Sequence, residues 1–297
     1  MTPGEAFARY EAIRDRLPKG RDFGRAVQVA GLEEVADQID VFVFDAFGVL
    51  NVGERPIEGA TECVARLREA GKQVFVLTNA ASFPQSETQA KFRRLGFDFS
   101  PYEIISSRDA CETHLSRHAD VALWGVAAAP EFQPCELSVQ SVPLNSDPAA
   151  YEDVDGILLL SSASWDRGQQ DMLLDALGRR PRPVVVANPD LVAPRETGLT
   201  LEPGYFAHDL QDALGIEVEY HGKPFPSVFE MVEARVPGVA PERIAMVGDT
   251  LHTDVLGAKA RGWKAVLISD HGLFAGLDVR GFIDRSGLSP DWVAPSI

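Results

Sequence analysis

Acidic, hydroxyl and ammonium side chains stand where they could act together on a phosphate group. Asp45 ends the run VFVFD, Thr78 ends QVFVLT, Asp249 ends IAMVGD, and Lys223 lies within HGKPFP. A carboxylate can attack phosphorus, and a lysine can neutralise the phosphoryl oxygens as charge redistributes. Any one of these residues could instead be a helix cap, a turn residue or a solvated lysine. Their recurrence favours one shared site over several unrelated turns.

The elements that must position these residues are short strands that alternate with helices. This alternation is typical of parallel βαβ units, so the sequence predicts an α/β fold. In an open parallel sheet, the carboxyl ends of neighbouring strands converge on one crevice where ligands bind. Helices are expected at 60–71, 86–96, 111–118 and 166–178. The predicted strands cover 41–45, 73–78, 103–107, 121–125, 156–161, 183–188, 244–249 and 264–269.

Composition limits the partners that the chain can have. Its 297 residues, 45% of them hydrophobic, suffice for one large domain or two of ordinary size. The formal charge of −16 offers no basic face, so neither nucleic acids nor anionic membranes are expected as partners. The N-terminus lacks a signal-peptide pattern, and no run approaches the roughly 18 apolar residues of a membrane span, so a cytoplasmic protein is expected. Three cysteines, Cys63, Cys111 and Cys135, indicate neither a disulfide framework nor a zinc site.

Four motifs, in chain order, resemble those of the haloacid dehalogenase (HAD) superfamily. They are FDAFGVL around Asp45, VLTNA around Thr78, HGKPFP around Lys223, and GDTLHTD at 248–254. Further stretches, including GVLNVGERPIEGA and ANPD, resemble the NagD-like branch of subfamily IIA, which is related to 4-nitrophenylphosphatases. The resemblance covers about residues 35–270. It implies a Rossmann-like parallel-sheet core with an inserted, smaller α/β cap of the C2 type.

The resemblance also implies a role for each residue at the phosphate. Asp45 would be the nucleophile of a phosphatase that forms an aspartyl-phosphate, and Lys223 would neutralise the reacting oxygens. Thr78 would contribute its hydroxyl to the phosphate. Asn79 would contribute a backbone N–H or its amide, and Gly48 would let the backbone approach the phosphate closely.

Mg²⁺ is the cofactor that the resemblance implies. This hard cation prefers a few oxygen ligands and keeps bound waters, and it would bring two anions together. Its ligands would be the carboxylates of Asp45 and Asp249 and the backbone carbonyl of Phe47. Asp254, five residues beyond Asp249, would hold either the metal shell or the lysine.

Phe47 departs from the pattern of most HAD phosphatases, which have a second aspartate there. That aspartate protonates the leaving group, whereas a phenyl ring carries no titratable proton. Aryl phosphates, whose leaving groups need little protonation, should therefore react faster than sugar phosphates. His252 within GDTLHTD is one candidate for a substitute acid or base, and His221 and His271 are others.

Two further readings of the sequence stay open. An aromatic residue at position 47 resembles the metal-independent 2-haloacid dehalogenases, although these need neither acid of GDTLHTD and carry their cap between the first two motifs. Here the long insertion lies between Thr78 and Lys223. The other reading is a HAD protein that binds a phosphorylated ligand without turning it over.

The expected domains follow from where the motifs lie. Residues 1–34 would form a helical N-terminal extension, 35–118 and 201–297 the core, and 119–200 the cap. A cap covers the site, excludes water and contacts the rest of the substrate, here a small phosphorylated metabolite. The resemblance also suggests a homodimer formed through the cap. The candidate substrate contacts in the cap are Trp165, Arg167, Asp190 and Arg195.

Overall fold

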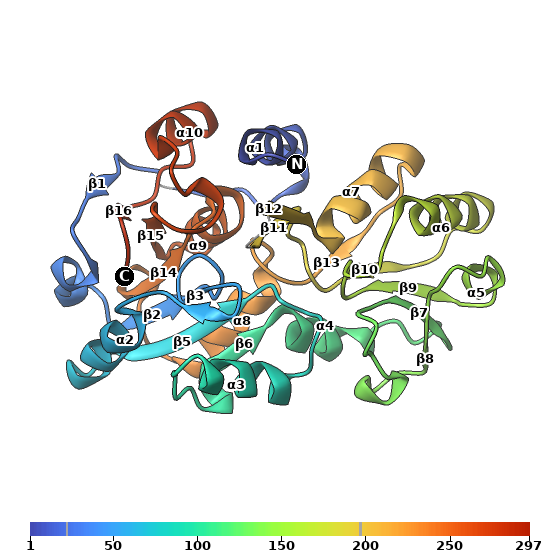
Figure 1. Ribbon diagram of the computed structural model, residues 1–297, viewed down its shortest axis with the longest axis horizontal. Coiled ribbons are helices and arrows are strands. Elements are labelled where there is room, and N and C mark those ends of the chain that lie inside the picture. The colour runs from blue at the N-terminus through green and yellow to red at the C-terminus, as the bar shows by residue number, and fades with distance from the viewer. Residues whose placement is uncertain (22, 196–197) are drawn as a thin grey trace.

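Two parallel sheets lie side by side in the computed structural model, which describes residues 1–21, 23–195 and 198–297 (Figure 1). Asp45 and Asp249 directly follow two neighbouring strands of the larger sheet, and Thr78 ends the strand on the other side of the first. The predicted strand ends therefore meet at one edge, and the predicted α/β fold is confirmed. Across the larger sheet the strands are β1 (Val27–Gln28), β16 (Trp292–Ala294), β15 (Lys264–Ile268), β14 (Ile244–Gly248), β2 (Val41–Phe44), β5 (Gln73–Thr78) and β6 (Ile104–Ser106).

Helices cover both faces of the larger sheet, which explains why its interior strand β2, VFVF, is apolar throughout. Successive side chains of a strand point to opposite faces. Val41 and Val43 pack under one helical layer, and Phe42 and Phe44 under the other. The first layer contains α1 (Pro3–Ala12), α8 (Pro226–Arg235), α9 (Leu256–Arg261) and α10 (Val279–Ser286), and the second contains α2 (Ala60–Glu69) and α3 (Gln85–Arg94). α4 (Ser107–Leu115) leads from β6 toward the smaller sheet.

The smaller sheet forms the inserted α/β unit, called the cap below. Its strands, in order, are β13 (Glu219–Tyr220), β10 (Val184–Val186), β9 (Gly156–Leu159), β7 (Trp124–Ala127) and β8 (Ser141–Pro143). Its helices are α5 (Ala149–Glu152), α6 (Arg167–Arg179) and α7 (Pro203–Leu214). The predicted return to the core at residue 201 is wrong, because α7 packs on the cap and β13 pairs with β10. The chain leaves the smaller sheet only after Tyr220.

The first 34 residues are not a separate extension. β1 adds an edge strand to the larger sheet by pairing with β16. Phe7 and Tyr10 of α1 are buried in the same core cluster as the helices α8 to α10. A capping box between Thr2 and Glu5, with Pro3 in the first turn, begins α1.

Two small antiparallel hairpins lie outside these two sheets. β3 (Asn51–Val52) and β4 (Arg55–Pro56) follow the first motif, and β11 (Val192–Arg195) pairs with β12 (Gly198–Leu201). All eight predicted strands are present within one to three residues at each end, whereas the short strands β1, β3, β4, β8, β13 and β16 and the β11–β12 hairpin were not predicted. Within the described residues, every helix is too short or too polar to cross a membrane.

Candidate active site

Lys223 lies at the centre of a buried charge cluster at the carboxyl edge of the larger sheet. Its Nζ is 2.6 Å from Oδ1 of Asp45 and 2.8 Å from Oδ1 of Asp254. The side chain is fully buried. Burial opposes its charge, but the carboxylates of Asp254, Asp45 and Asp190 outweigh burial and raise the pKa of Lys223. The lysine is therefore an ammonium ion, as a phosphate site requires.

The amide of Asn79 holds the backbone that carries this lysine. Its Oδ1 accepts a hydrogen bond from the N–H of Lys223 at 2.7 Å, and its Nδ2 donates to the carbonyl of Lys223 at 2.9 Å. The same Nδ2 donates to Oδ1 of Asp190 at 2.8 Å. Gly222, at φ +125°, brings the chain so close that a Cβ would lie 2.7 Å from the oxygen of Asn79. The Asn79 amide is thus used for positioning, which leaves its backbone N–H for the expected phosphate contact.

Asp249 is fixed from both sides by the loops around it. Its Oδ2 accepts from the N–H of Leu273 at 2.8 Å, and its Oδ1 from the hydroxyl of Thr250 at 3.1 Å. Gly48, at φ +78°, passes so close that a Cβ there would lie 2.7 Å from Oδ2. Gly48 therefore permits a close approach to Asp249, and its expected approach to the phosphate stays a prediction.

Each of the two carboxylate oxygens of Asp254 lies against a nitrogen donor. Oδ1 lies against Lys223, and Oδ2 accepts from the N–H of Thr250 at 3.1 Å. The residue lies in a single π-helical turn, Leu251–Val255, of the kind that often marks functional sites. Of the two roles left open by the sequence, this geometry favours holding the lysine over binding a metal directly.

The carboxylates carry more negative charge than one lysine can balance. Oxygens of Asp45, Asp249 and Asp254 lie within 4.8 Å of one another. Burial, with Asp254 nearby, raises the pKa of Asp45 to about 6 although Lys223 opposes the rise, and burial with Asp254 and Asp45 raises that of Asp249 well above its usual value. Such raised values indicate that the cluster lacks positive charge. Its oxygen donors suit Mg²⁺, which Asp45, Asp249 and the carbonyl of Phe47 would hold.

A small cavity of about 60 Å³ opens above this cluster. Asp45, Thr78 and Asp249 line it from the core. We call these three residues, with Lys223 and Asp254 beneath them, the floor of the site. We call the part of the lining that comes from Tyr10 of α1 and from the cap the roof. The roof residues that line the cavity are Tyr10, Asn188, Asp190, Val192, Ala193, Pro194, Arg195 and Glu202.

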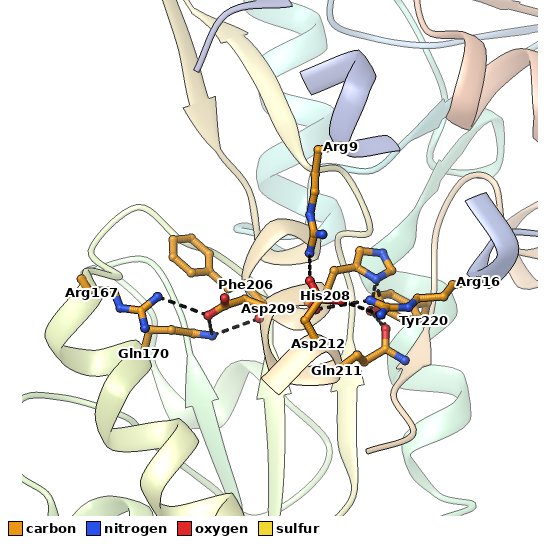
Figure 2. Close-up of polar contacts among 10 residues, drawn as sticks. All are labelled: Arg9, Arg16, Arg167, Gln170, Phe206, His208, Asp209, Gln211, Asp212 and Tyr220. Atoms are coloured by element: carbon orange, nitrogen blue, oxygen red, sulfur yellow. Dashed lines mark hydrogen bonds and ion pairs between the residues drawn. The ribbon is translucent and has the colours of Figure 1, made fainter. Parts of the chain in front are cut away.

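Two of the four candidate cap residues face this cavity and two do not. Asp190 and Arg195 line it, and burial raises the pKa of Asp190 to about 8. Trp165 lies elsewhere in the cap, where its Nε1 donates to Gln170 at 3.0 Å. Arg167 is exposed and pairs with Asp171 and Asp209, the latter shown in Figure 2.

None of the three candidate histidines is among the described residues that line the small cavity. The ring of His252 stacks on Tyr10 with centroids 4.8 Å apart, and its Nε2 contacts Glu11. Burial lowers the pKa of His252 to about 4, and the residue does not line the cavity. His221 contacts Ser227 and Glu219, and His271 contacts Ser296.

Phe47 lines both the small cavity and a larger one of about 410 Å³, a size typical of sites for small molecules. Lys91 Nζ lies 4.3 Å from the centroid of the Phe47 ring, and the Arg195 guanidinium carbon 5.0 Å from it. Phe83, 46% exposed, also lines the larger cavity. Sequence reasoning missed Tyr10, Phe83 and Lys91, since none belongs to a motif. Tyr10 lies in the predicted helical extension and Lys91 in the predicted helix 86–96, but neither helical pattern points to a site.

Comparison with known proteins places these features in a family. The family model described as haloacid dehalogenase-like hydrolase matches residues 42–134, and a second HAD hydrolase-like model matches 220–297. Chronophin from Bos taurus is 30% identical over 258 residues, which are 80% of this chain and 83% of that protein.

Two solved structures share the fold. One is of a possible sugar phosphatase from Cytophaga hutchinsonii (TM-score 0.80, 23% identity, 91% of this chain and 98% of the other). The second is 4-nitrophenylphosphatase from Thermotoga maritima (TM-score 0.71, 22% identity, 88% and 96%). With its motifs and its cap, the chain belongs to the haloacid dehalogenase superfamily of hydrolases, in subfamily IIA.

Proposed function

We propose that the protein is a Mg²⁺-dependent phosphatase that acts on a small phosphate monoester through an aspartyl-phosphate at Asp45. The geometry of Asp45 carries the proposal. Its Oδ1 is held by the Lys223 ammonium at 2.6 Å and by the N–H of Ala46 at 2.7 Å. Its Oδ2 has no hydrogen-bond partner in the described part of the chain, so it can serve as the attacking oxygen. The names of the two structural neighbours, a possible sugar phosphatase and a 4-nitrophenylphosphatase, support the same chemistry.

Each residue of the floor has a different role in the proposed reaction. Asp45 attacks phosphorus, and Lys223 neutralises the charge that develops on the phosphoryl oxygens. Thr78 accepts from the N–H of Ala80 at 3.1 Å, so its own hydrogen can be donated to a phosphoryl oxygen. When bound, Mg²⁺ would screen the nucleophile from the negative phosphate and polarise the phosphoryl group. Water then hydrolyses the aspartyl-phosphate and regenerates Asp45.

Phe47 sets the preference among substrates. The floor has no carboxylic acid two residues after the nucleophile, so protonation of the leaving group is weak there. A phenolate leaves without much protonation, whereas a sugar alkoxide does not. We therefore expect aryl phosphates to be turned over faster than sugar phosphates.

Phosphate release from 4-nitrophenyl phosphate tests the proposal directly. The purified protein should release phosphate with Mg²⁺, should lose this activity when the metal is chelated, and should regain it when Mg²⁺ is returned. Asp45→Asn should reduce kcat by about 10⁴-fold or more, as loss of a nucleophile does elsewhere. Absence of turnover in the presence of Mg²⁺ would contradict the proposal, as would an active Asp45→Asn variant.

Two other functions make different predictions in the same assays. A 2-haloacid dehalogenase would release halide from 2-chloropropionate without metal. A binding protein would be stabilised against heat by inorganic phosphate and Mg²⁺ while releasing no phosphate from any ester. The position of the cap, after Thr78, and the acids Asp249 and Asp254 favour the phosphatase over the dehalogenase.

A further inference from the structure

Helix α1 joins the core to the cap across the active site. It lies outside residues 42–134 and 220–297, which the family models match. Phe7 and Tyr10 bury it in the core. Arg9 on the helix and Arg16 just after it each pair with Asp212 of the cap helix α7 at 2.5 Å (Figure 2). The helix is thus fixed to both parts of the molecule.

Tyr10 is the residue that α1 places in the active site. Its side chain is buried, and its ring is stacked on His252 of the fourth motif, with the rings 8° from parallel. Its hydroxyl oxygen accepts a hydrogen bond from the N–H of Leu191, a cap residue, at 3.0 Å. The hydroxyl therefore has a fixed position on the roof of the cavity that Asp45 and Asp249 line from below.

The hydroxyl of Tyr10 retains a hydrogen that it can donate. The N–H of Leu191 occupies one of the lone pairs of its oxygen, and within residues 1–21, 23–195 and 198–297 no acceptor takes its hydrogen. Burial, with Asp190, Asp254 and Asp249 nearby, raises the pKa of Tyr10 well above 10. The group thus remains a neutral donor at any pH at which the enzyme would work.

We infer that Tyr10 donates a hydrogen bond to the leaving oxygen of the phosphate ester, an inference that rests on the proposed phosphatase function. In phosphoryl transfer, the attacking and leaving oxygens lie roughly in line with phosphorus. The leaving oxygen therefore points away from Asp45, and Tyr10, which lines the same cavity from α1, is the residue whose hydroxyl we assign to it. Tyr10 thereby provides part of what Phe47 cannot, because it stabilises negative charge on the departing oxygen. It keeps its own proton, and the departing phenolate or alkoxide takes a proton from water after it leaves the site.

The dependence of rate on the leaving group tests this role. Wild type and Tyr10→Phe should be compared on aryl phosphates whose phenols range from 4-nitrophenol, weakly basic as its anion, to unsubstituted phenol. Because this hydrogen bond would stabilise a developing charge, Tyr10→Phe should lower kcat for phenyl phosphate by about 10- to 100-fold. The loss for 4-nitrophenyl phosphate should be a few-fold, so the plot of log kcat against the pKa of the leaving group should become steeper.

Tyr220→Phe is the matched control. Its hydroxyl is also buried and donates to Gln211 Oε1 at 2.7 Å in the cap, away from the cavity (Figure 2). Both variants lose one buried hydroxyl and keep the ring, so both can be destabilised by a similar amount. The slope of the leaving-group plot should remain that of the wild type in Tyr220→Phe alone.

Three outcomes would overturn the inference. Parallel leaving-group plots for wild type and Tyr10→Phe, with turnover present, would exclude Tyr10 and leave the phosphatase function intact. A steeper plot for Asp190→Asn but not for Tyr10→Phe would assign the donor to Asp190, the other protonated group on the roof. If wild type with Mg²⁺ turned over no ester, the proposed function would fail and the role of Tyr10 with it.

Discussion

The floor and the roof of the active site are built in different ways. In the floor, Asp45, Thr78 and Asp249 lie at the ends of neighbouring strands of one sheet. Beneath them, Lys223 forms short ion pairs with Asp45 and Asp254. The roof brings together α1 and, far from it in the chain, the segment around Asp190 with the β11–β12 hairpin that follows it. The floor is therefore suited to the proposed reaction on phosphorus. The roof and the larger cavity are suited to the part of the substrate that differs between enzymes.

Removing the ammonium of the floor should have the largest effect. Lys223→Met should lower kcat for 4-nitrophenyl phosphate by about 10²- to 10³-fold, because the charge that develops on the phosphoryl oxygens loses its partner. Lys259→Met is the control, since Lys259 is also buried and paired, with Asp291 at 2.6 Å, but lies outside the site. Both variants should have a lower free energy of unfolding, but only Lys223→Met should have a lower kcat. Equal losses of kcat would show that the floor does not depend on Lys223.

The region where α1 contacts α7 should make the free energy of unfolding depend on pH. His208 of α7 is buried, and burial, with Arg16 and Arg9 nearby, lowers its pKa to about 4 (Figure 2). In the unfolded chain His208 takes up a proton near pH 6.5, whereas in the folded protein it stays neutral down to about pH 4. The free energy of unfolding should therefore fall as the pH drops from 6.5 to 4. The decrease in the free energy of unfolding should be at most about 3 kcal/mol.

Urea unfolding at a series of pH values measures this effect. In His208→Gln, the decrease in the free energy of unfolding between pH 6.5 and 4 should be smaller than in wild type, whatever the stability of the variant at pH 7. An unchanged decrease would show that His208 is not the group that resists the proton.

An acid at position 47 should make turnover less dependent on the hydrogen bond from Tyr10. Phe47→Asp should raise kcat for phenyl phosphate about 10-fold, below most of the usual range for general acid catalysis. The gain is limited because Lys91 and Arg195, which flank the ring of Phe47, would favour the ionised form of the new acid. Phe47→Leu, which has no acid, should show no gain. If both variants behaved alike, the missing acid would not be what limits the wild type.

The smallest effect is expected at the larger cavity. Arg195→Met keeps the apolar part of the side chain but removes a charge beside Phe47. We expect a KM that rises a few-fold for 3-carboxyphenyl phosphate and stays nearly constant for phenyl phosphate, because only the former carries a second negative charge. Equal changes for both esters would indicate that Arg195 does not bind the organic part of the substrate.

Much of the floor could be predicted because strand ends and motifs are local in sequence. The runs around Asp45, Thr78 and Asp249 predicted three neighbouring parallel strands, and the structure confirms that these strands adjoin. The roles of individual side chains were harder to predict. Asn79 binds the backbone of Lys223 through its amide, and Gly48 makes room for Asp249. Each of these contacts depends on a segment distant in the chain, so no local pattern encodes it.

The sequence by itself determined the α/β class, the parallel core and the chemistry of the floor, since apolar periodicity and residue type act over a few neighbouring positions. Only the tertiary structure decided what stands on the roof. It turned His252 toward α1 and away from the cavity, and it brought Tyr10 to within reach of a substrate. The physical reason is that burial of the apolar face of α1 between core and cap fixes where Tyr10 lies. That burial depends on the packing of both parts of the molecule.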